Sequence, residues 1–286
     1  LRDAYMSNDD FPLSPDCWAD AAAFYQAFLK AEDFLSSVPA KSRGVNVDRS
    51  LYDLTRHLYA QKSEPEALFR AKLGASETLA AVWLSKVRTL AEWFSAAQPV
   101  AAFQGLFVDD LRDLVKLSAD PSRITQVASC LVERGVILIY EPHIPGMKVD
   151  GAVFKLASGN PVIGMSLRYP RLDYFWFTLM HELSHVVLHG DLLSTPIIDD
   201  MDTENTDLVE LQADKLATDS LIPRGEWRSC PAKYSLAERD VLDFAAKLGI
   251  APQIVAGRLR REFRRHDLFS ELVNRINIRE TLFGSV

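Results

Sequence analysis

Three residues, His181, Glu182 and His185, form a His-Glu-x-x-His pattern, and their types and spacing imply a reaction. On a helix, residues four apart lie one turn above each other on the same face, so both imidazoles can reach a single ion. Zn²⁺ is the ion that this pattern predicts. Glu182 lies beside the ligand face without being forced onto the metal. This placement suits a general base that acts on a metal-activated water molecule.

A five-residue pattern with three fixed positions also occurs by chance, so the motif alone is weak evidence for a metal site. The residues around it strengthen that interpretation. Apolar side chains surround it on almost every side of the expected helix: Tyr174, Phe175, Trp176, Phe177, Leu179, Met180, Leu183, Val186, Val187 and Leu188. A helix that is apolar all round is a buried helix. Histidines and a glutamate inside such a helix need partners, and a metal ion supplies one.

A zinc site needs a third protein ligand, and three residues are candidates. His189 lies about 11–12 Å along a straight helix from His181, too far to share one ion with it, so we expect a supporting role. Asp191 occupies the last ligand position of the metzincin pattern, but Leu188 stands where that pattern requires glycine. The third candidate, Glu210, is the one we favour.

Glu210 begins a stretch, 210–223, in which residues recur at helical spacing. Glu210 and Asp214 share one face of this helix, and the small side chains of Ala213 and Ala217 permit close helix packing. We expect Glu210 to bind the metal and Asp214 to orient a ligand histidine through its second ring nitrogen. The alternative is that both are surface carboxylates.

These motifs resemble the ImmA/IrrE-type metallopeptidases, in which His-Glu-x-x-His precedes a helix of the form Glu-x-x-Ala-(Asn or Asp)-x-(apolar)-Ala-x-x-Leu-x-Pro. The sequence fits this form from Glu210 to Pro223, with Leu216 where an aromatic residue is frequent. The likeness runs from about Phe103 to the C-terminus and is widest to the HigA-linked branch, although the N-terminal helix-turn-helix of that branch is not evident. The resemblance implies a gluzincin-like domain that cuts a partner protein, commonly a helix-turn-helix repressor, in a stress or mobile-element response.

The elements that position the motif fall into two parts, with a boundary near 99–121. Apolar residues at three- and four-residue intervals predict N-terminal helices over 18–35, 51–61, 64–73 and 77–96. The apolar face of the last of these is interpreted as core rather than as a partner-binding surface.

Beyond Pro99 the pattern becomes mixed. It predicts helices over 111–117, 124–134, 237–248, 252–263 and 269–276, and short strands over 136–140, 151–156 and 161–167. The predicted fold class is therefore α+β and mainly helical, with a helical N-terminal region, 1–99. Together with the small sheet, the family resemblance implies that 100–286 is a zincin-like metallopeptidase domain.

Two charged segments of the sequence are relevant to the kind of partner that the chain binds. The segment between His189 and Glu210 holds many acids and no base, so it either favours a basic substrate or is a solvated loop. Residues 235–266 have the order helix, glycine-containing turn, helix of a helix-turn-helix, and several arginines follow the turn. The chain nevertheless carries a net charge of −7, so we do not expect it to bind DNA directly.

Composition limits the class of protein further. The chain has 286 residues, of which 48% are hydrophobic and 25% charged, enough to bury a sizeable core. Three widely spaced cysteines predict neither a disulfide framework nor a cysteine zinc site. The sequence shows no leader and no apolar run near 18 residues, so we expect a cytoplasmic protein without a membrane segment.

Three functions are compatible with these observations. The first is a zinc endopeptidase that cleaves a regulatory protein, such as a repressor or antitoxin, in a stress, toxin–antitoxin or mobile-element response. The second is an antitoxin-like or repressor-like binding module with a structural or inactive zinc site. The third is a peptidase that stays inactive until a signal acts through the N-terminal helices. The presence of Glu182 favours an enzyme, because a purely structural site needs no base.

Overall fold

The structure is a computed structural model that describes residues 21–37, 51–52, 54–55, 59, 75–199 and 207–284. The predicted helix over 64–73 and most of the one over 51–61 lie outside the described residues, as does Cys17. The chain divides into two compact units, residues 1–86 and 87–286. The division falls within helix α4 (Ala75–Ala97), and the expected domain boundary at residue 99 stays a prediction.

In the first unit, helix α1 (Ala21–Ser37) confirms the helix that the sequence predicts over 18–35. Ala27, Ala31 and Leu35 recur every four residues and are all buried, so they form the apolar stripe of this helix. Near its start, the ring of Phe24 meets that of Tyr59 edge-on, with centroids 5.3 Å apart.

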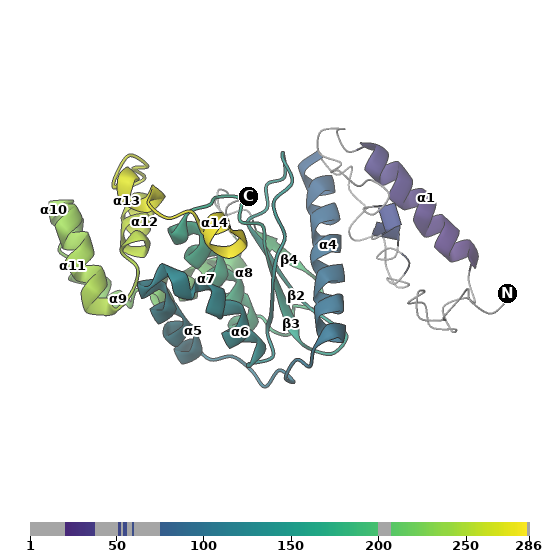
Figure 1. Cartoon of the computed structure of the whole chain (residues 1–286), viewed down its shortest axis with the longest axis horizontal. Helices are drawn as coiled ribbons and strands as arrows, with labels where there is room; N and C mark the ends of the chain where they lie inside the picture. The colour runs from purple at the N-terminus through teal and green to yellow at the C-terminus, as the bar shows by residue number, and fades with distance from the viewer. Residues whose placement is uncertain are drawn as a thin grey trace. The chain divides into compact units, whose positions relative to one another are not determined.

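The second unit contains a four-stranded mixed sheet, of which strands β2, β3 and β4 are labelled in Figure 1. Its strands are β1 (Ile137–Tyr140), β2 (Gly151–Lys155), β3 (Pro161–Met165) and β4 (Ile197–Asp199), in the order β1-β3-β2-β4. β1 runs parallel to β3, while β2 is antiparallel to both of its neighbours. The first three strands confirm those that the sequence predicts, whereas β4 has no counterpart among the predicted strands.

The two faces of the sheet bury different sets of residues. Val153 and Ile163, which are register partners, belong to the main hydrophobic core together with the residues of helix α7 (Leu172–Leu188). Phe154 points to the opposite face, where the guanidinium of Arg88 from the second half of α4 lies 4.4 Å from the ring centroid. The alternation of side chains along β2 therefore gives α7 one face of the sheet.

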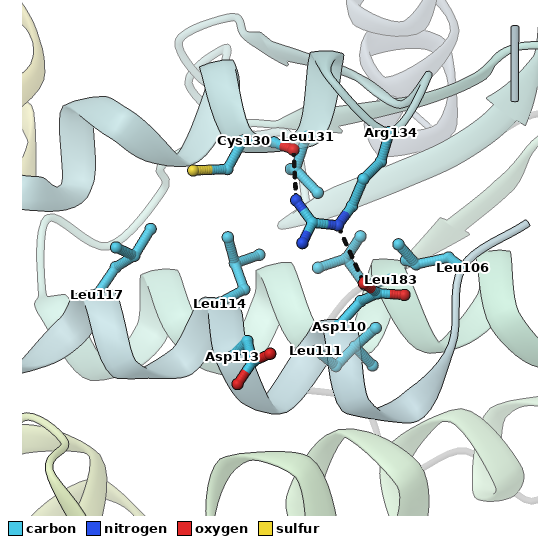
Figure 2. A pocket seen from close by; sticks show the side chains of 10 residues that line it. All are labelled: Leu106, Asp110, Leu111, Asp113, Leu114, Leu117, Cys130, Leu131, Arg134 and Leu183. Atoms are coloured by element: carbon cyan, nitrogen blue, oxygen red, sulfur yellow. Dashed lines mark hydrogen bonds and ion pairs between the residues drawn. The ribbon is translucent and has the colours of Figure 1, made fainter. Parts of the chain in front are cut away.

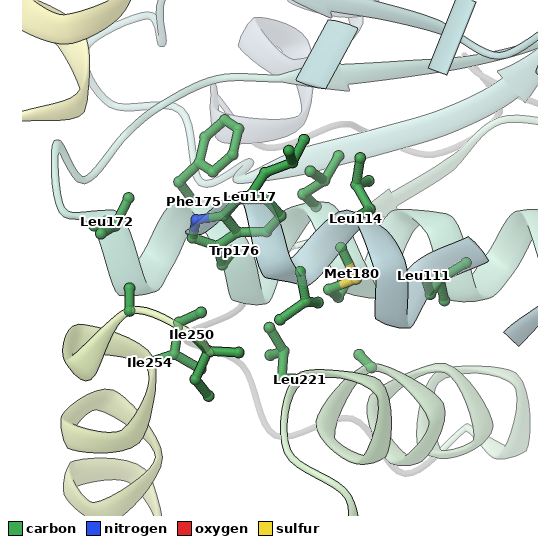
Figure 3. Packing of buried hydrophobic residues seen from close by; sticks show 14 of the residues in the cluster. Leu111, Leu114, Leu117, Leu172, Phe175, Trp176, Met180, Leu221, Ile250 and Ile254 are labelled. Atoms are coloured by element: carbon green, nitrogen blue, oxygen red, sulfur yellow. The ribbon is translucent and has the colours of Figure 1, made fainter. Parts of the chain in front are cut away.

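Helix α7 lies at the centre of the second unit, packed against β2 and β3, α5 (Val108–Val115), α8 (Leu208–Leu221) and α12 (Pro252–Glu262). Figure 3 shows the core that results, with the ring system of Trp176 between side chains of α5 and α12. Trp176 and Met180 are fully buried. The mainly helical α+β class that the sequence predicts is confirmed.

Short helices complete the described part of this unit: η3 (Lys116–Ala119), η4 (Pro121–Gln126), α6 (Val127–Val132), α9 (Arg224–Arg228), α10 (Ala232–Ser235), α11 (Glu238–Leu248), α13 (Ser270–Asn274) and α14 (Ile278–Phe283). Arg134, just after α6, joins that helix to α5 (Figure 2): its Nε donates to Asp110 at 3.1 Å and its Nη1 to the carbonyl of Cys130 at 3.0 Å. None of the described helices is long and apolar enough to span a membrane.

Helices α11 and α12 correspond to the predicted helix-turn-helix-like segment. Gly249 between them has a φ of 67°, the left-handed conformation that ends a helix most easily when the residue is glycine. Ile254, Val255 and Leu259 of α12 are fully buried, and the helix packs against α7. The second helix of this pair therefore supports the motif helix from outside.

Candidate metal centre

Helix α7 brings the two motif histidines together, as the spacing predicts. The Nε2 atoms of His181 and His185 lie 3.0 Å apart, and both side chains are buried. One nitrogen of each ring therefore faces a common point between α7 and the elements around it.

Helix α8 places a carboxylate at the same point. Asp207 caps this helix, because its side chain accepts from the backbone N–H of Val209, and Glu210 follows in the first turn. Oε2 of Glu210 lies 3.1 Å from Nε2 of His181 and 3.6 Å from Nε2 of His185. The structure thus brings together His181, His185 and Glu210, the three residues that we expect to bind the metal.

Asp199 adds a carboxylate that the sequence analysis did not select. Its Oδ2 lies 3.4 Å from Nε2 of His181 and 3.7 Å from Nε2 of His185, and only 3% of the residue is exposed. Ligand atoms of His181, His185, Asp199 and Glu210 all lie within 4.8 Å of one another. The interpretation of 189–210 as a solvated acidic loop is therefore wrong at Asp199, which belongs to β4; Asp200, Asp202 and Glu204 lie outside the described residues.

A second layer of side chains orients the two histidines. Asp214 Oδ1 lies 3.0 Å from Nδ1 of His181, the relation that their helical positions predict. Nδ1 of His189 lies 3.1 Å from Nδ1 of His185, and its Nε2 lies 3.0 Å from Oε1 of Gln212. His189 therefore contacts a ligand histidine from behind.

Asp191, the metzincin-like candidate, lies in the turn after α7. It is exposed, and it is not among the residues whose ligand atoms converge. The helix continues through Leu188 to a C-cap at His189, so the chain does not turn early as a metzincin helix does at its glycine.

Glu182 occupies a different position from the four convergent residues. Its side chain is fully buried, and neither carboxylate oxygen has a hydrogen-bond partner. The carboxylate rests on Gly151 of β2, where a Cβ atom would lie 2.0 Å from Oε1. Burial raises the pKa of Glu182 well above its usual range, and the negative charge of Asp199 raises it further.

Two hydrogen-bond acceptors face each other within the cluster, so a cation is needed between them. Asp214 is an acceptor, so Nδ1 of His181 carries the proton, and Nε2 of the neutral ring is then an acceptor that faces the acceptor Oε2 of Glu210. Burial lowers the pKa of His181, but Asp199, Asp214 and Glu210 together raise it well above its usual value. Either a proton or a metal ion satisfies these acceptors, and metal binding uses the deprotonated ring.

The carboxylate of Glu210 is held in its charged form. Burial raises its pKa, but the interactions with the imidazole rings of His181 and His185 outweigh this and bring the pKa well below the ordinary value. A charged carboxylate beside two imidazole nitrogens is a donor set that zinc hydrolases use. The residues present therefore fit a divalent transition metal such as zinc.

The comparison with protein families agrees with this geometry. Residues 133–260 match the Peptidase_M78 model, described as an IrrE N-terminal-like domain, and this range includes every residue of the cluster. No curated protein and no solved structure matched the chain. The expected likeness to the HigA-linked branch stays a prediction. Residues 133–260 of this chain are therefore similar to the IrrE N-terminal-like domain of the ImmA/IrrE metallopeptidase family.

Proposed function

We propose that this chain is a zinc-dependent endopeptidase, with His181, His185 and Glu210 as the metal ligands. Two imidazoles and one carboxylate are the protein ligands of several zinc peptidases. When bound, the ion would polarise the carbonyl of the scissile peptide bond and make a water molecule more acidic. Asp214 and His189 hold the two rings in the orientation that points each Nε2 at the same place.

The observation that carries the proposal is the buried, unpaired carboxylate of Glu182. Burial without a donor is costly for the charged form of a carboxyl group, and groups perturbed in this way are concentrated at functional sites. We assign it the role of general base, which takes a proton from the attacking water and passes it to the leaving amine.

As substrate we propose a regulatory protein, such as a helix-turn-helix repressor or an antitoxin. The resemblance to the ImmA/IrrE family supports this class of substrate. So do the exposed acids on the segments that flank the metal centre, Asp191 and Asp207. A DNA-binding protein offers basic segments that such surroundings attract.

The test compares the wild type with Glu182→Gln. The amide has the size of the carboxylate but accepts no proton, so the variant should bind zinc and fold like the wild type without cleaving a co-expressed regulator from the neighbouring gene. Metal content, thermal unfolding and the size of the regulator on a gel are the measurements. Equal cleavage by both proteins, or an intact regulator with both under stressed and unstressed conditions, would contradict the proposal.

Asp199 favours a second candidate function, an antitoxin-like or repressor-like binding module. A fourth protein ligand would close the coordination sphere, as in structural zinc sites. In that case Asp199→Asn should weaken zinc binding about as much as Glu210→Gln does, and the wild type should leave the regulator intact. If Asp199→Asn leaves zinc affinity within about twofold while the wild type cleaves, the binding-module function is excluded.

A further inference from the structure

A cavity of about 370 Å³ opens between the first turns of α7 and the end of α12. Its lining combines arginines with aromatic side chains: Arg171, Asp173, Tyr174, Phe177, Thr178, Gly257, Arg260, Arg261, Arg264 and His266. Four guanidinium groups thus face one carboxylate within a chain whose net charge is −7. Positive charge is therefore concentrated at this cavity, although the net charge of the whole chain is negative.

The fold holds two of these arginines in place. Arg171 Nε donates to Asp173 at 3.0 Å, and Arg260 Nη1 donates to Ser270 Oγ at 3.3 Å. Burial lowers the pKa of Arg260, and the neighbouring charge of Arg171 lowers it further. Asp173 neutralises part of this positive charge, and the two ordered cations can bind a further anion at little entropic cost.

Gly257 and Asp173 set how closely α12 approaches α7 beside the cavity. A Cβ atom on Gly257 would lie 2.6 Å from Oδ2 of Asp173, so the absence of a side chain lets the two helices come together. In the same cavity lining, the guanidinium of Arg171 lies 4.8 Å from the ring centroid of Tyr174. The cavity therefore joins a cationic wall to an aromatic surface.

We propose that this cavity binds a small phosphorylated molecule. Arginine recognises phosphate oxygens through two parallel N–H donors, and a volume of this size falls within the range of small-molecule sites, roughly 300–1,000 Å³. The rings of Tyr174 and Phe177 provide an apolar surface for the remainder of such a ligand. A compact phosphorylated compound with a flat ring, of the size of a mononucleotide, matches both features.

The cavity is linked to the metal centre through two successive hydrogen bonds. Arg261, which lines the cavity, donates to Asp214 Oδ2 at 3.0 Å, and Asp214 contacts Nδ1 of His181. A ligand phosphate that attracts Arg261 changes the charge beside Asp214. The site is therefore placed to influence the metal centre without touching it.

Calorimetric titration of the full-length protein with inorganic phosphate, adenosine monophosphate and a phosphoserine peptide tests the proposal. Wild type should bind the mononucleotide saturably, and Arg264→Gln should weaken this binding roughly tenfold, as the loss of one charge-assisted contact does. Arg265→Gln is the matched control, because Arg265 is the next residue, pairs with Asp267 and does not line the cavity. It should leave the affinity within about twofold.

Three outcomes would overturn the proposal: no saturable binding of the mononucleotide, an equal loss in both arginine variants, or tighter binding of the phosphoserine peptide than of the mononucleotide. An equal loss would indicate a general charge effect, and tighter peptide binding would indicate a site for a modified protein. The titrations measure binding and require no cleavage. They therefore test whether the cavity binds a mononucleotide even if the chain is not a peptidase.

Discussion

The carboxylate of Glu182 rests on Gly151, in the space that a side chain on this strand would fill. The proposed base thus depends on a residue in another element that contributes no functional group. Gly151→Ala should displace Glu182 and lower the cleavage rate about 100-fold, the loss that a misplacement of about 1 Å produces. Zinc content should not change, because Gly151 provides no ligand.

Gly225→Ala is the control for this substitution. Gly225 has no positive φ and no heavy atom near the position of an added Cβ, so alanine should be accepted there without loss of cleavage. Peptide cleavage and zinc content are measured for both variants. If Gly151→Ala cleaves like the wild type, the carboxylate of Glu182 does not need its place against β2.

The ligand residues are expected to differ in their effect on zinc affinity. His185→Ala and Glu210→Gln remove donors and should lose most of the metal, whereas Asp214→Asn acts through His181 and should weaken binding roughly 10–100-fold. Asp191→Asn should have no effect, because Asp191 is exposed outside the cluster. Competition with a chromogenic chelator gives the affinities; a larger loss in Asp191→Asn than in Glu210→Gln would revive the metzincin-like assignment.

At the scale of single residues, the sequence predicts which side chains lie together when helical periodicity relates their positions. His181 and His185, or Glu210 and Asp214, share a helix face, so their spacing indicates their common direction. Asp199 could not be found in this way. It lies on a three-residue strand within an acidic segment, and only the pairing of β4 with β2, which sets Asp199 opposite Gly151, turns it toward the histidines.

At the scale of elements, the metal centre depends on the packing of α8 against α7. Ala213 is fully buried on α8, next to Asp214 and one turn after Glu210. Ala213→Leu should destabilise the fold by about 1–3 kcal/mol through overpacking, and it should weaken zinc binding because it pushes Glu210 away from the histidines. Lys215 is exposed on the same helix, so Lys215→Leu is the control and should change neither property.

Thermal unfolding measures the stability of these variants, and chelator competition measures their zinc affinity. Unaltered zinc affinity in Ala213→Leu would show that the ligand carboxylate adjusts independently of the helix.

Most described helices and three of the four strands could be predicted, because each carries an apolar periodicity of adequate length. Elements below that length escaped prediction. β4 has three residues, α9 and α10 have five and four, and the predicted helix over 124–134 begins as the 3₁₀ turn η4. Such short pieces are stabilised by tertiary contacts rather than by a pattern of their own.

At the scale of the whole second unit, the cavity and the metal centre should be coupled. If a phosphorylated ligand draws Arg261 from Asp214, the carboxylate accepts more strongly from His181 and makes that ring a better ligand. Adenosine monophosphate should then raise zinc affinity about fivefold or more, and zinc should raise the affinity for the nucleotide by the same factor. Chelator-buffered zinc titrations measure this, and Arg261→Gln should abolish the effect. Equal zinc affinities with and without nucleotide would show that the two sites are independent.

The burial of α7 on nearly all sides has a consequence for how this protein can diverge. Thirteen of its seventeen residues are buried, so almost every substitution there disturbs either the core or the chemistry. The freedom to acquire a new specificity must lie in the segments that frame the helix, where Leu192, Leu208 and Leu211 are exposed. A directed-evolution library restricted to these framing positions should retain folded, metal-binding members far more often than one spread along the motif helix itself.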